Sequence, residues 1–112
     1  MNTKNKNAYK YLDPSFSVNS DRLIIHKSNS LIHELAKFLV YWENISNGNR
    51  VITEARFNNG KRADLFNVTT NTAIEIVHSE GKESVERKKE TYPVDVIFLE
   101  ADKVIKYWLP KL

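Results

Sequence analysis

Two carboxylates on neighbouring predicted strands are the residues of this chain best suited to chemistry. Asp64 lies in the apolar run 62–66 and Glu75 in the run 73–79. Each run alternates with period two, which predicts a strand, and the polar turn 69–72 predicts a hairpin. A two-residue loop in this turn places the two carboxylates directly opposite each other. Like charges roughly 5 Å apart destabilise a sheet, so the pair predicts a cation between them.

A third acidic residue, Glu54, is predicted to lie beside this pair. Alternation places it on a strand, and the turn 58–60 predicts a hairpin into the next strand. With a three-residue loop, Glu54 falls opposite Asp64, whereas a two-residue loop would move the register by one. The alternative is a surface glutamate paired with Arg56 or Lys61. Three acids in a row across one sheet face would be hard to explain as structure alone.

These residue types suit a hard divalent cation, Mg²⁺ or Mn²⁺. Such ions take oxygen ligands and keep several waters, so two or three carboxylates are enough. Asp64 and Glu75 would be ligands, together with the backbone carbonyl of Ile76. Glu54 would be a third ligand or would hold a water on the metal. A cation in this place can activate water and stabilise charge on a phosphate.

The composition fits one small globular domain. The chain has 112 residues, of which 41% are hydrophobic and 28% charged, and it has no cysteine. Disulfides, cysteine nucleophiles and cysteine zinc sites are therefore excluded. We expect a basic, flexible segment over 1–20 and one domain over 21–112. No apolar run could span a membrane and no signal peptide is visible, so we expect a cytoplasmic protein without membrane contact. The net charge of +3 is compatible with nucleic acid.

The order of predicted elements is α-β-β-β-α-β, which predicts an α/β fold with a mixed sheet flanked by helices. Helices are expected at 30–46 and 83–91, and a buried strand at 94–99. Residues 23–25 are a candidate accessory strand, and 102–109 could be a helix or a strand. Three- and four-residue spacing predicts that the first helix faces the core with Leu31, Ile32, Leu35, Ala36, Leu39 and Trp42.

The motifs in this order resemble the PD-(D/E)XK nuclease superfamily, most closely the competence-protein CoiA-like nucleases. The matching motifs are His26-Lys27-Ser28, His33-x3-Lys37, Arg62-Ala-Asp64, Glu75-Ile-Val-His-Ser79 and Arg87-x4-Tyr92. The resemblance covers about residues 26–99. It implies a restriction-endonuclease-like α-β-β-β-α-β core.

The resemblance implies a metal-dependent DNA endonuclease that hydrolyses phosphodiester bonds by water attack. Branched, Holliday-junction-like DNA is a candidate substrate by analogy with the family. A homodimer in the cytoplasm of a prokaryote, or of a virus or plasmid host, is expected. Tyr41, Trp42 and Trp108 are candidate interface residues.

One position departs from the family pattern. The superfamily places lysine, or in these relatives often glutamine, two residues after the glutamate, where this chain has Val77. Another cation would have to take that role, and Lys82, Lys88 and Lys61 are the candidates. His78 is expected to face the opposite side. Lys88 therefore joins Glu54, Asp64 and Glu75 as the expected catalytic residues.

DNA contacts are expected from the motifs and from the basic residues around them. Lysine and arginine would contact backbone phosphates, with salt-sensitive binding and little base readout. The expected residues are His26, Lys27, Ser28, His33, Lys37, Lys61, Arg62, Ser79, Lys82, Arg87, Lys88 and Tyr92. Two alternatives stay open. One is a catalytically weak nucleic-acid-binding or regulatory protein, which Val77 favours, and the other is a structural domain whose acids are incidental.

Overall fold

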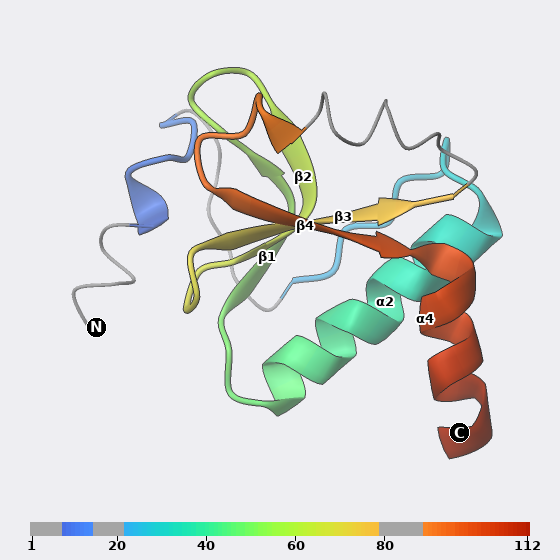
Figure 1. The fold of residues 1–112 in the computed structure, drawn as a ribbon. Helices are drawn as coiled ribbons and strands as arrows, with labels where there is room; N and C mark the ends of the chain where they lie inside the picture. Colours follow the sequence, from blue (N-terminus) through green and yellow to red (C-terminus); the bar gives the residue numbers. More distant parts are fainter. Residues whose placement is uncertain (1–7, 15–21, 79–88) are drawn as a thin grey trace.

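A computed structural model shows an α/β protein in which helices cover one face of a four-stranded mixed sheet (Figure 1). The structure describes residues 8–14, 22–78 and 89–112. The sheet has the order β1-β2-β3-β4; the first three strands are antiparallel, and β3 and β4 are parallel. The strands are β1 (Val51–Arg56), β2 (Arg62–Asn67), β3 (Thr72–Val77) and β4 (Asp95–Glu100).

The first helix, α2 (Leu31–Ser46), confirms the helix predicted over 30–46. It begins at Ser30, whose hydroxyl accepts a 3.1 Å hydrogen bond from the backbone N–H of His33 and so caps a free donor. Gly48 follows its end with a φ of 84°, a left-handed conformation that glycine adopts without strain. A second helix, α4 (Ala101–Trp108), and a 3₁₀ turn, η1 (Leu109–Lys111), close the chain.

The apolar face predicted for α2 does not all face the sheet. Leu31, Leu35 and Trp42 are 80%, 39% and 52% exposed. The buried residues of the helix are Ala36 and Leu39, as predicted, together with Lys37, Val40 and Tyr41. The predicted face is therefore correct for Ala36 and Leu39 and wrong for Leu31, Leu35 and Trp42. The helix is turned so that it buries Lys37, which acidic side chains surround.

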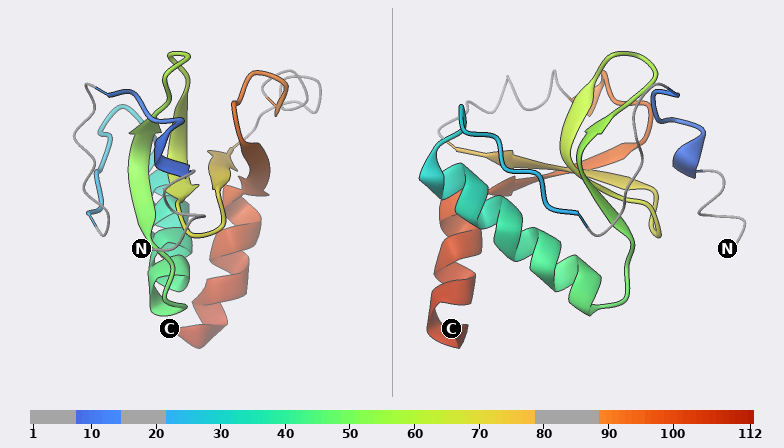
Figure 2. Two further views of the ribbon diagram at one scale, coloured as in Figure 1. Left: turned by 90° about the vertical axis from the view of Figure 1, so that its left-hand side faces the viewer. Right: turned by 180° about the vertical axis from the view of Figure 1, so that it is seen from behind.

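The opposite face of the sheet is covered by residues near the N-terminus (Figure 2). Ala8 and Leu12 are buried there against Phe57 and Phe66. The backbone of Leu12 also bridges to Phe57. Residues 8–12 are therefore docked, where the sequence predicted a loose terminus. The rest of that segment, 1–7 and 15–20, lies outside the described residues.

The pairing of β2 with β3 follows the predicted register. Leu65 pairs with Ile74, and Asn67 pairs with Thr72. Continued by one residue, this register places Asp64 beside Glu75, as expected. The loop differs from the prediction: the turn takes four residues, 68–71, rather than two.

The pairing of β1 with β2 also has the predicted register, with a distortion at Glu54. The backbone N–H of Phe57 donates a 2.8 Å bond to the carbonyl of Lys61, as a three-residue loop requires. Glu54 has a φ of 51°, an uncommon conformation for a residue with a side chain. Strict alternation predicts Ile52 and Ala55 on opposite faces of this strand, but both pack in the same core cluster, so that prediction is wrong. The distortion turns Glu54 towards α2, where Lys37 meets it.

The remaining elements bear out part of the prediction. The strand expected over 94–99 is β4, but the predicted burial is wrong, because β4 stands at the end of the strand order and Ile97 is 46% exposed. The helix is the correct alternative for 102–109. Residues 23–25 form no strand; the segment runs beside β1 and is held by the Thr53 hydroxyl. The helix expected over 83–91 falls mostly outside the described residues. Among the helices that the structure describes, none is long and apolar enough to cross a membrane.

Candidate functional site

An open hollow of about 460 Å³ lies where the start of α2 meets the first half of β2 and the end of β3. We call it the acidic hollow, because the two acids Asp64 and Glu75 line it. Its lining residues are Ser28, Asn29, Ser30, His33, Asp64, Glu75, Ile76 and His78. The structure therefore brings five of the predicted site residues to one place: Ser28, His33, Asp64, Glu75 and Ile76.

The two acids of the hairpin are held by reciprocal hydrogen bonds. Glu75 Oε1 accepts from the backbone N–H of Asp64 at 2.8 Å. Asp64 Oδ2 accepts from the backbone N–H of Ile76 at 2.7 Å. The last β2–β3 pair on this side is Leu65 with Ile74, and the two side-chain bonds follow directly after it. Each carboxylate thus takes over a backbone donor and is fixed at the edge of the hollow.

His33 places a positive charge against Asp64. Its Nε2 lies 3.3 Å from Asp64 Oδ2, and its Nδ1 lies 3.0 Å from Glu34 Oε1. Both neighbours are acceptors, so both ring nitrogens donate and the ring is an imidazolium. The hydrogen bond to Asp64, opposed by burial and aided by Glu34, raises the pKa of His33 to about 9.

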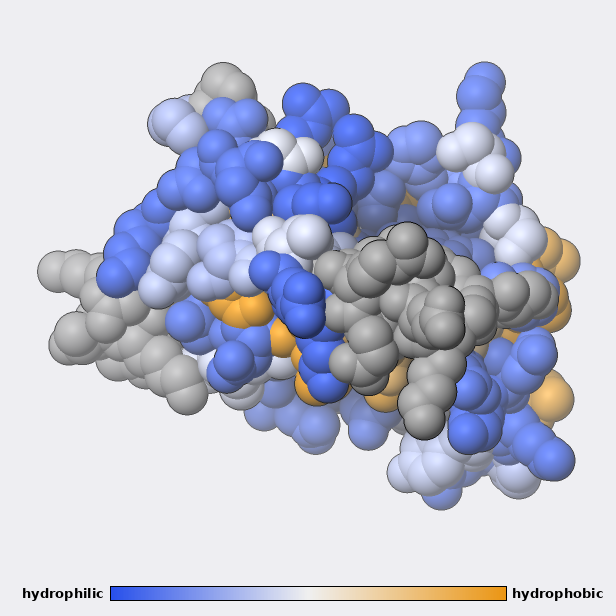
Figure 3. All heavy atoms as spheres, turned by 45° about the horizontal axis from the view of Figure 1, so that its top comes forward, coloured by the Kyte–Doolittle hydropathy of each residue, from blue (hydrophilic) through white to orange (hydrophobic). Residues whose placement is uncertain are grey.

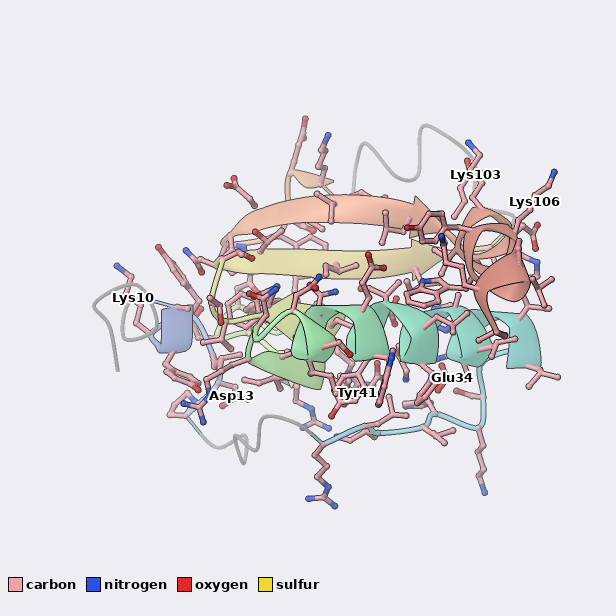
Figure 4. All side chains as sticks on the ribbon, turned by 90° about the horizontal axis from the view of Figure 1, so that it is seen from below. Lys10, Asp13, Glu34, Tyr41, Lys103 and Lys106 are labelled. Carbon is pink, nitrogen blue, oxygen red and sulfur yellow. The ribbon has the colours of Figure 1, made fainter. Side chains whose placement is uncertain are left out.

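Glu34 joins α2 to the segment that precedes it. Its carboxylate accepts a 2.8 Å bond from the backbone N–H of His26 and a 3.0 Å bond from the side chain of Asn29. It also pairs with His33 and with Lys37. Burial alone would raise the pKa of Glu34, but these donors, Lys37 first, outweigh it and lower the pKa to about 2. In Figure 4, Glu34 points towards the segment that runs alongside α2.

Lys37 is a completely buried cation beside the acid row, by which we mean Glu54, Asp64 and Glu75 on neighbouring strands. Its side chain is 0% exposed, and Nζ lies 2.8 Å from Glu34 Oε2 and 3.7 Å from Glu54 Oε2. It also donates a 2.8 Å hydrogen bond to the carbonyl of Ile24. A buried charge requires such partners, and breaking the set is strongly destabilising. The predicted contact of Lys37 with DNA does not fit this burial.

Glu54 completes the row but stands behind the hollow rather than in its lining. The residue is 8% exposed, and burial, opposed in part by the charge of Lys37, raises its pKa. Within the described part of the chain its Oε2 has no hydrogen-bond partner. A buried carboxylate oxygen without a donor is costly, and strained or unsatisfied groups gather at functional sites.

The acids suit a hard cation through a pair of ligands rather than a cage. Among the residues that the structure describes, no group of three histidine, aspartate or glutamate side chains is placed to hold a metal ion. Asp64 and Glu75 nevertheless face one hollow with the backbone of Ile76 beside them. Mg²⁺ commonly uses one or two carboxylates and retains water for its other positions. The donor set fits this kind of ion.

Several predicted DNA-contacting residues lie around the hollow or near it. Lys27 and Arg62 are exposed, and the ring of His26 lies 3.4 Å from Arg62 and 2.7 Å from Ser28. Lys61 is exposed in the β1–β2 turn. Four further predicted residues, Ser79, Lys82, Arg87 and Lys88, lie outside the described residues.

Tyr92 has a packing role in the structure. Its hydroxyl donates a 3.0 Å bond to the carbonyl of Arg62, and its ring meets Phe57 edge to face at 6.0 Å. The ring packs against the core cluster on the side of the sheet away from α2. Tyr92 therefore holds the β2 backbone near Asp64, and this role differs from the predicted contact with DNA.

Val77 is buried and offers no substitute for the ammonium expected at its position. It is 7% exposed at the end of β3. Of the lysines that the structure describes, Lys37 is the one paired with a member of the acid row. The positive group that lines the hollow is instead His33.

Sequence reasoning missed four residues of the site. The sequence left Glu34 open between a solvated helix face and a functional role, and indicated only helix capping for the segment of Asn29 and Ser30. His78 was expected to face away, but it lines the hollow. Glu34 at one position and Lys37 three residues later is the signal that could have found the network, because such pairs are neighbours on a helix.

A more apolar groove lies elsewhere, between α2, β4 and α4, with a volume of about 570 Å³. Its acids, Glu43 and Glu100, lie outside the row formed by Glu54, Asp64 and Glu75. Paired acids and perturbed pKa values favour the acidic hollow as the functional site. No family model, curated protein or solved structure matches the chain.

Proposed function

We propose that the protein is a divalent-metal-dependent nuclease that hydrolyses phosphodiester bonds in DNA, with a core of the restriction-endonuclease type. The observation that carries the proposal is the pair Asp64 and Glu75, on neighbouring strands and lining one hollow with Ile76. The motifs around them, in the order seen in PD-(D/E)XK nucleases, supply the nuclease context.

Asp64, Glu75 and the backbone carbonyl of Ile76 would hold Mg²⁺ or Mn²⁺. When bound, such an ion supplies Lewis-acid stabilisation of the phosphate and a water of lowered pKa. The hydrogen bonds between the two strands keep the carboxylates in place before any ion arrives. This preorganisation spares the site a rearrangement during reaction.

The chain's own cations would bind and orient the phosphate. His33, whose two ring nitrogens face Asp64 and Glu34, lines the hollow and would attract a phosphate by its positive charge. Arg62 and Lys27 are exposed near it and would contact neighbouring phosphates. Lys37 acts from behind by balancing the charge of Glu34 and Glu54.

A cleavage assay tests the proposal. Purified protein is incubated with supercoiled, linear and four-way-junction DNA in Mg²⁺, Mn²⁺ or EDTA. We expect metal-dependent cutting that Asp64→Asn and Glu75→Gln abolish. Asp95→Asn, which changes an exposed acid at the start of β4, is the matched control and should cut normally.

A second function, nucleic-acid binding with weak or no turnover, is favoured by the buried Val77. It predicts that wild-type protein binds DNA and leaves it intact with either metal. Cutting that survives in both acid variants would contradict a role for this pair. Wild-type protein that neither binds nor cuts DNA would contradict both functions.

A further inference from the structure

The outward side of α2 carries a stripe of exposed apolar side chains. We define the outward stripe as Leu31, Leu35, Phe38 and Trp42, which are 80%, 39%, 40% and 52% exposed. Their spacing of four, three and four residues places them on one side of the helix, in the pattern of a coiled-coil seam. The rings of Phe38 and Trp42 are stacked at 6.5 Å between centroids.

The charged residues of this helix lie away from the stripe. Glu34 and Lys37 are turned into the buried network, and Glu43 lines the groove beside β4 and α4. By contrast, Lys103 and Lys106 of α4 point away from the molecule in Figure 4. The described residues on the face drawn in Figure 3 are also mainly hydrophilic. Aromatic enrichment with loss of charge is typical of the centre of a protein interface.

We propose that the outward stripe pairs with the same stripe of a second copy of this chain, with the two α2 helices antiparallel about a two-fold axis. A seam with heptad spacing is matched by another helix with the same spacing, and a two-fold axis supplies one. Antiparallel pairing places Leu31 against Trp42 of the second copy, and Leu35 against Phe38. Each layer then joins a smaller to a larger side chain, which fills space evenly.

The exposed area of the stripe fits a small dimer interface. The four residues expose about 450 Å² per protomer on ordinary residue areas, or roughly 900 Å² per pair, which is below the ~1,000 Å² of a stable specific interface and suits a weak, transient dimer. We therefore expect micromolar association. α4 runs beside α2 on the same side of the sheet and can add contact at the edge (Figure 2).

The proposal refines the homodimer expected from the sequence. Tyr41 is only 6% exposed and belongs to the core, so it is removed from the interface. Trp42 becomes the main aromatic contact. The acidic hollow lies at the N-terminal end of α2, so an antiparallel pair places the two hollows at opposite ends of the helix pair.

Sedimentation equilibrium tests the surface. We expect the wild-type mass to rise from that of one 13.0 kDa chain at about 1 µM towards that of two chains at about 100 µM. Leu31→Glu and Trp42→Glu should weaken the association at least tenfold. Leu112→Glu is the matched control for Leu31→Glu, because both side chains are 80% exposed.

Thiol cross-linking tests the antiparallel arrangement. The chain has no cysteine, so Leu31→Cys and Trp42→Cys each introduce a single thiol. With a short bifunctional reagent, a mixture of the two variants should cross-link more than either variant alone. Leu31→Cys cross-linking best to itself would contradict antiparallel pairing.

Two results would overturn the proposal. One is a wild-type chain that stays monomeric at all concentrations. The other is a wild-type dimer that persists in both glutamate variants. Binding of a monomeric wild-type protein to neutral phosphatidylcholine vesicles, lost in Leu31→Glu, would assign the stripe to a lipid surface instead.

Discussion

The carboxylate of Glu75 accepts a 2.8 Å hydrogen bond from the backbone N–H of Asp64. The Asp64 carboxylate in turn accepts one from the strand of Glu75, at the N–H of Ile76. The acids proposed to bind metal are therefore also the groups that satisfy backbone donors where the β2–β3 register pairs end. Structure and proposed function depend on the same oxygens.

This double role predicts how substitutions of Asp64 affect stability. Asn keeps a carbonyl acceptor for the N–H of Ile76, so Asp64→Asn should cost about 1 kcal/mol in the free energy of unfolding or less. Ala leaves that N–H without its acceptor, and Asp64→Ala should cost about 2 kcal/mol. Urea denaturation measures both. Equal costs for the two variants would show that the hydrogen bond contributes nothing.

The buried network around Lys37 predicts a large loss of stability when its charge is removed. Lys37→Met leaves Glu34 and Glu54 without their cation and should lower the free energy of unfolding by about 3 kcal/mol. Lys103→Met is the control, because its pair with Glu100 is exposed, and it should cost less than about 1 kcal/mol. Similar losses in the two variants, measured by urea denaturation, would contradict the network.

The lowered pKa of Glu34 predicts that the free energy of unfolding falls in acid. Its pKa is about 2 in the folded protein against an ordinary value of 4.5. A lowered folded pKa stabilises the protein above pH 4.5, and that stabilisation is lost as pH falls from 4.5 towards 2. It amounts to at most about 3 kcal/mol.

The variant Glu34→Gln isolates this effect. Its free energy of unfolding should lie below that of the wild type at pH 6, and the two should converge as pH approaches 2. Denaturant unfolding at each pH gives the difference. Glu100→Gln serves as a control, since the Glu100 side chain is 60% exposed and its pair with Lys103 should contribute less than about 1 kcal/mol. A constant difference between Glu34→Gln and wild type would contradict the shifted pKa.

Glu54 is predicted to matter more for activity than for stability. Burial raises its pKa, its Oε2 has no described hydrogen-bond partner, and its φ is 51°. Glu54→Gln keeps the volume and removes the buried charge, so unfolding should change by less than about 1 kcal/mol, while DNA cleavage falls at least tenfold. A loss of stability above about 2 kcal/mol with full cleavage would reverse this assignment.

The register of the acid row could be predicted from the sequence, because turn residues and alternation act locally. The turns at 58–60 and 68–71 allow few loop lengths, and each loop length sets the pairing of Glu54, Asp64 and Glu75. The observed four-residue turn keeps the predicted register. Residues 68 and 71, which were predicted to pair, belong to the loop, and the other pairs are unchanged.

The orientation of α2 could not be predicted in the same way. Periodicity favours the side with the most apolar residues, and that side includes Leu31, Leu35 and Trp42, which are exposed. The inward side contains Lys37, which is acceptable there because acids from other segments surround it. Such pairing over long sequence separations leaves no local pattern. The left-handed backbone at Glu54 could not be predicted either, because Glu54 pairs with Lys37, which is distant in the sequence.

Binding of Mn²⁺ tests the central claim most directly. Electron paramagnetic resonance counts free Mn²⁺ during a titration, and circular dichroism confirms that each variant is folded. We expect wild-type protein to bind one ion per chain with a Kd below about 1 mM. Asp64→Asn and Glu75→Gln should each weaken binding at least tenfold, and Asp95→Asn should bind as wild type does. Wild-type binding no tighter than that of the Asp64→Asn, Glu75→Gln double variant would contradict a metal site at this hairpin.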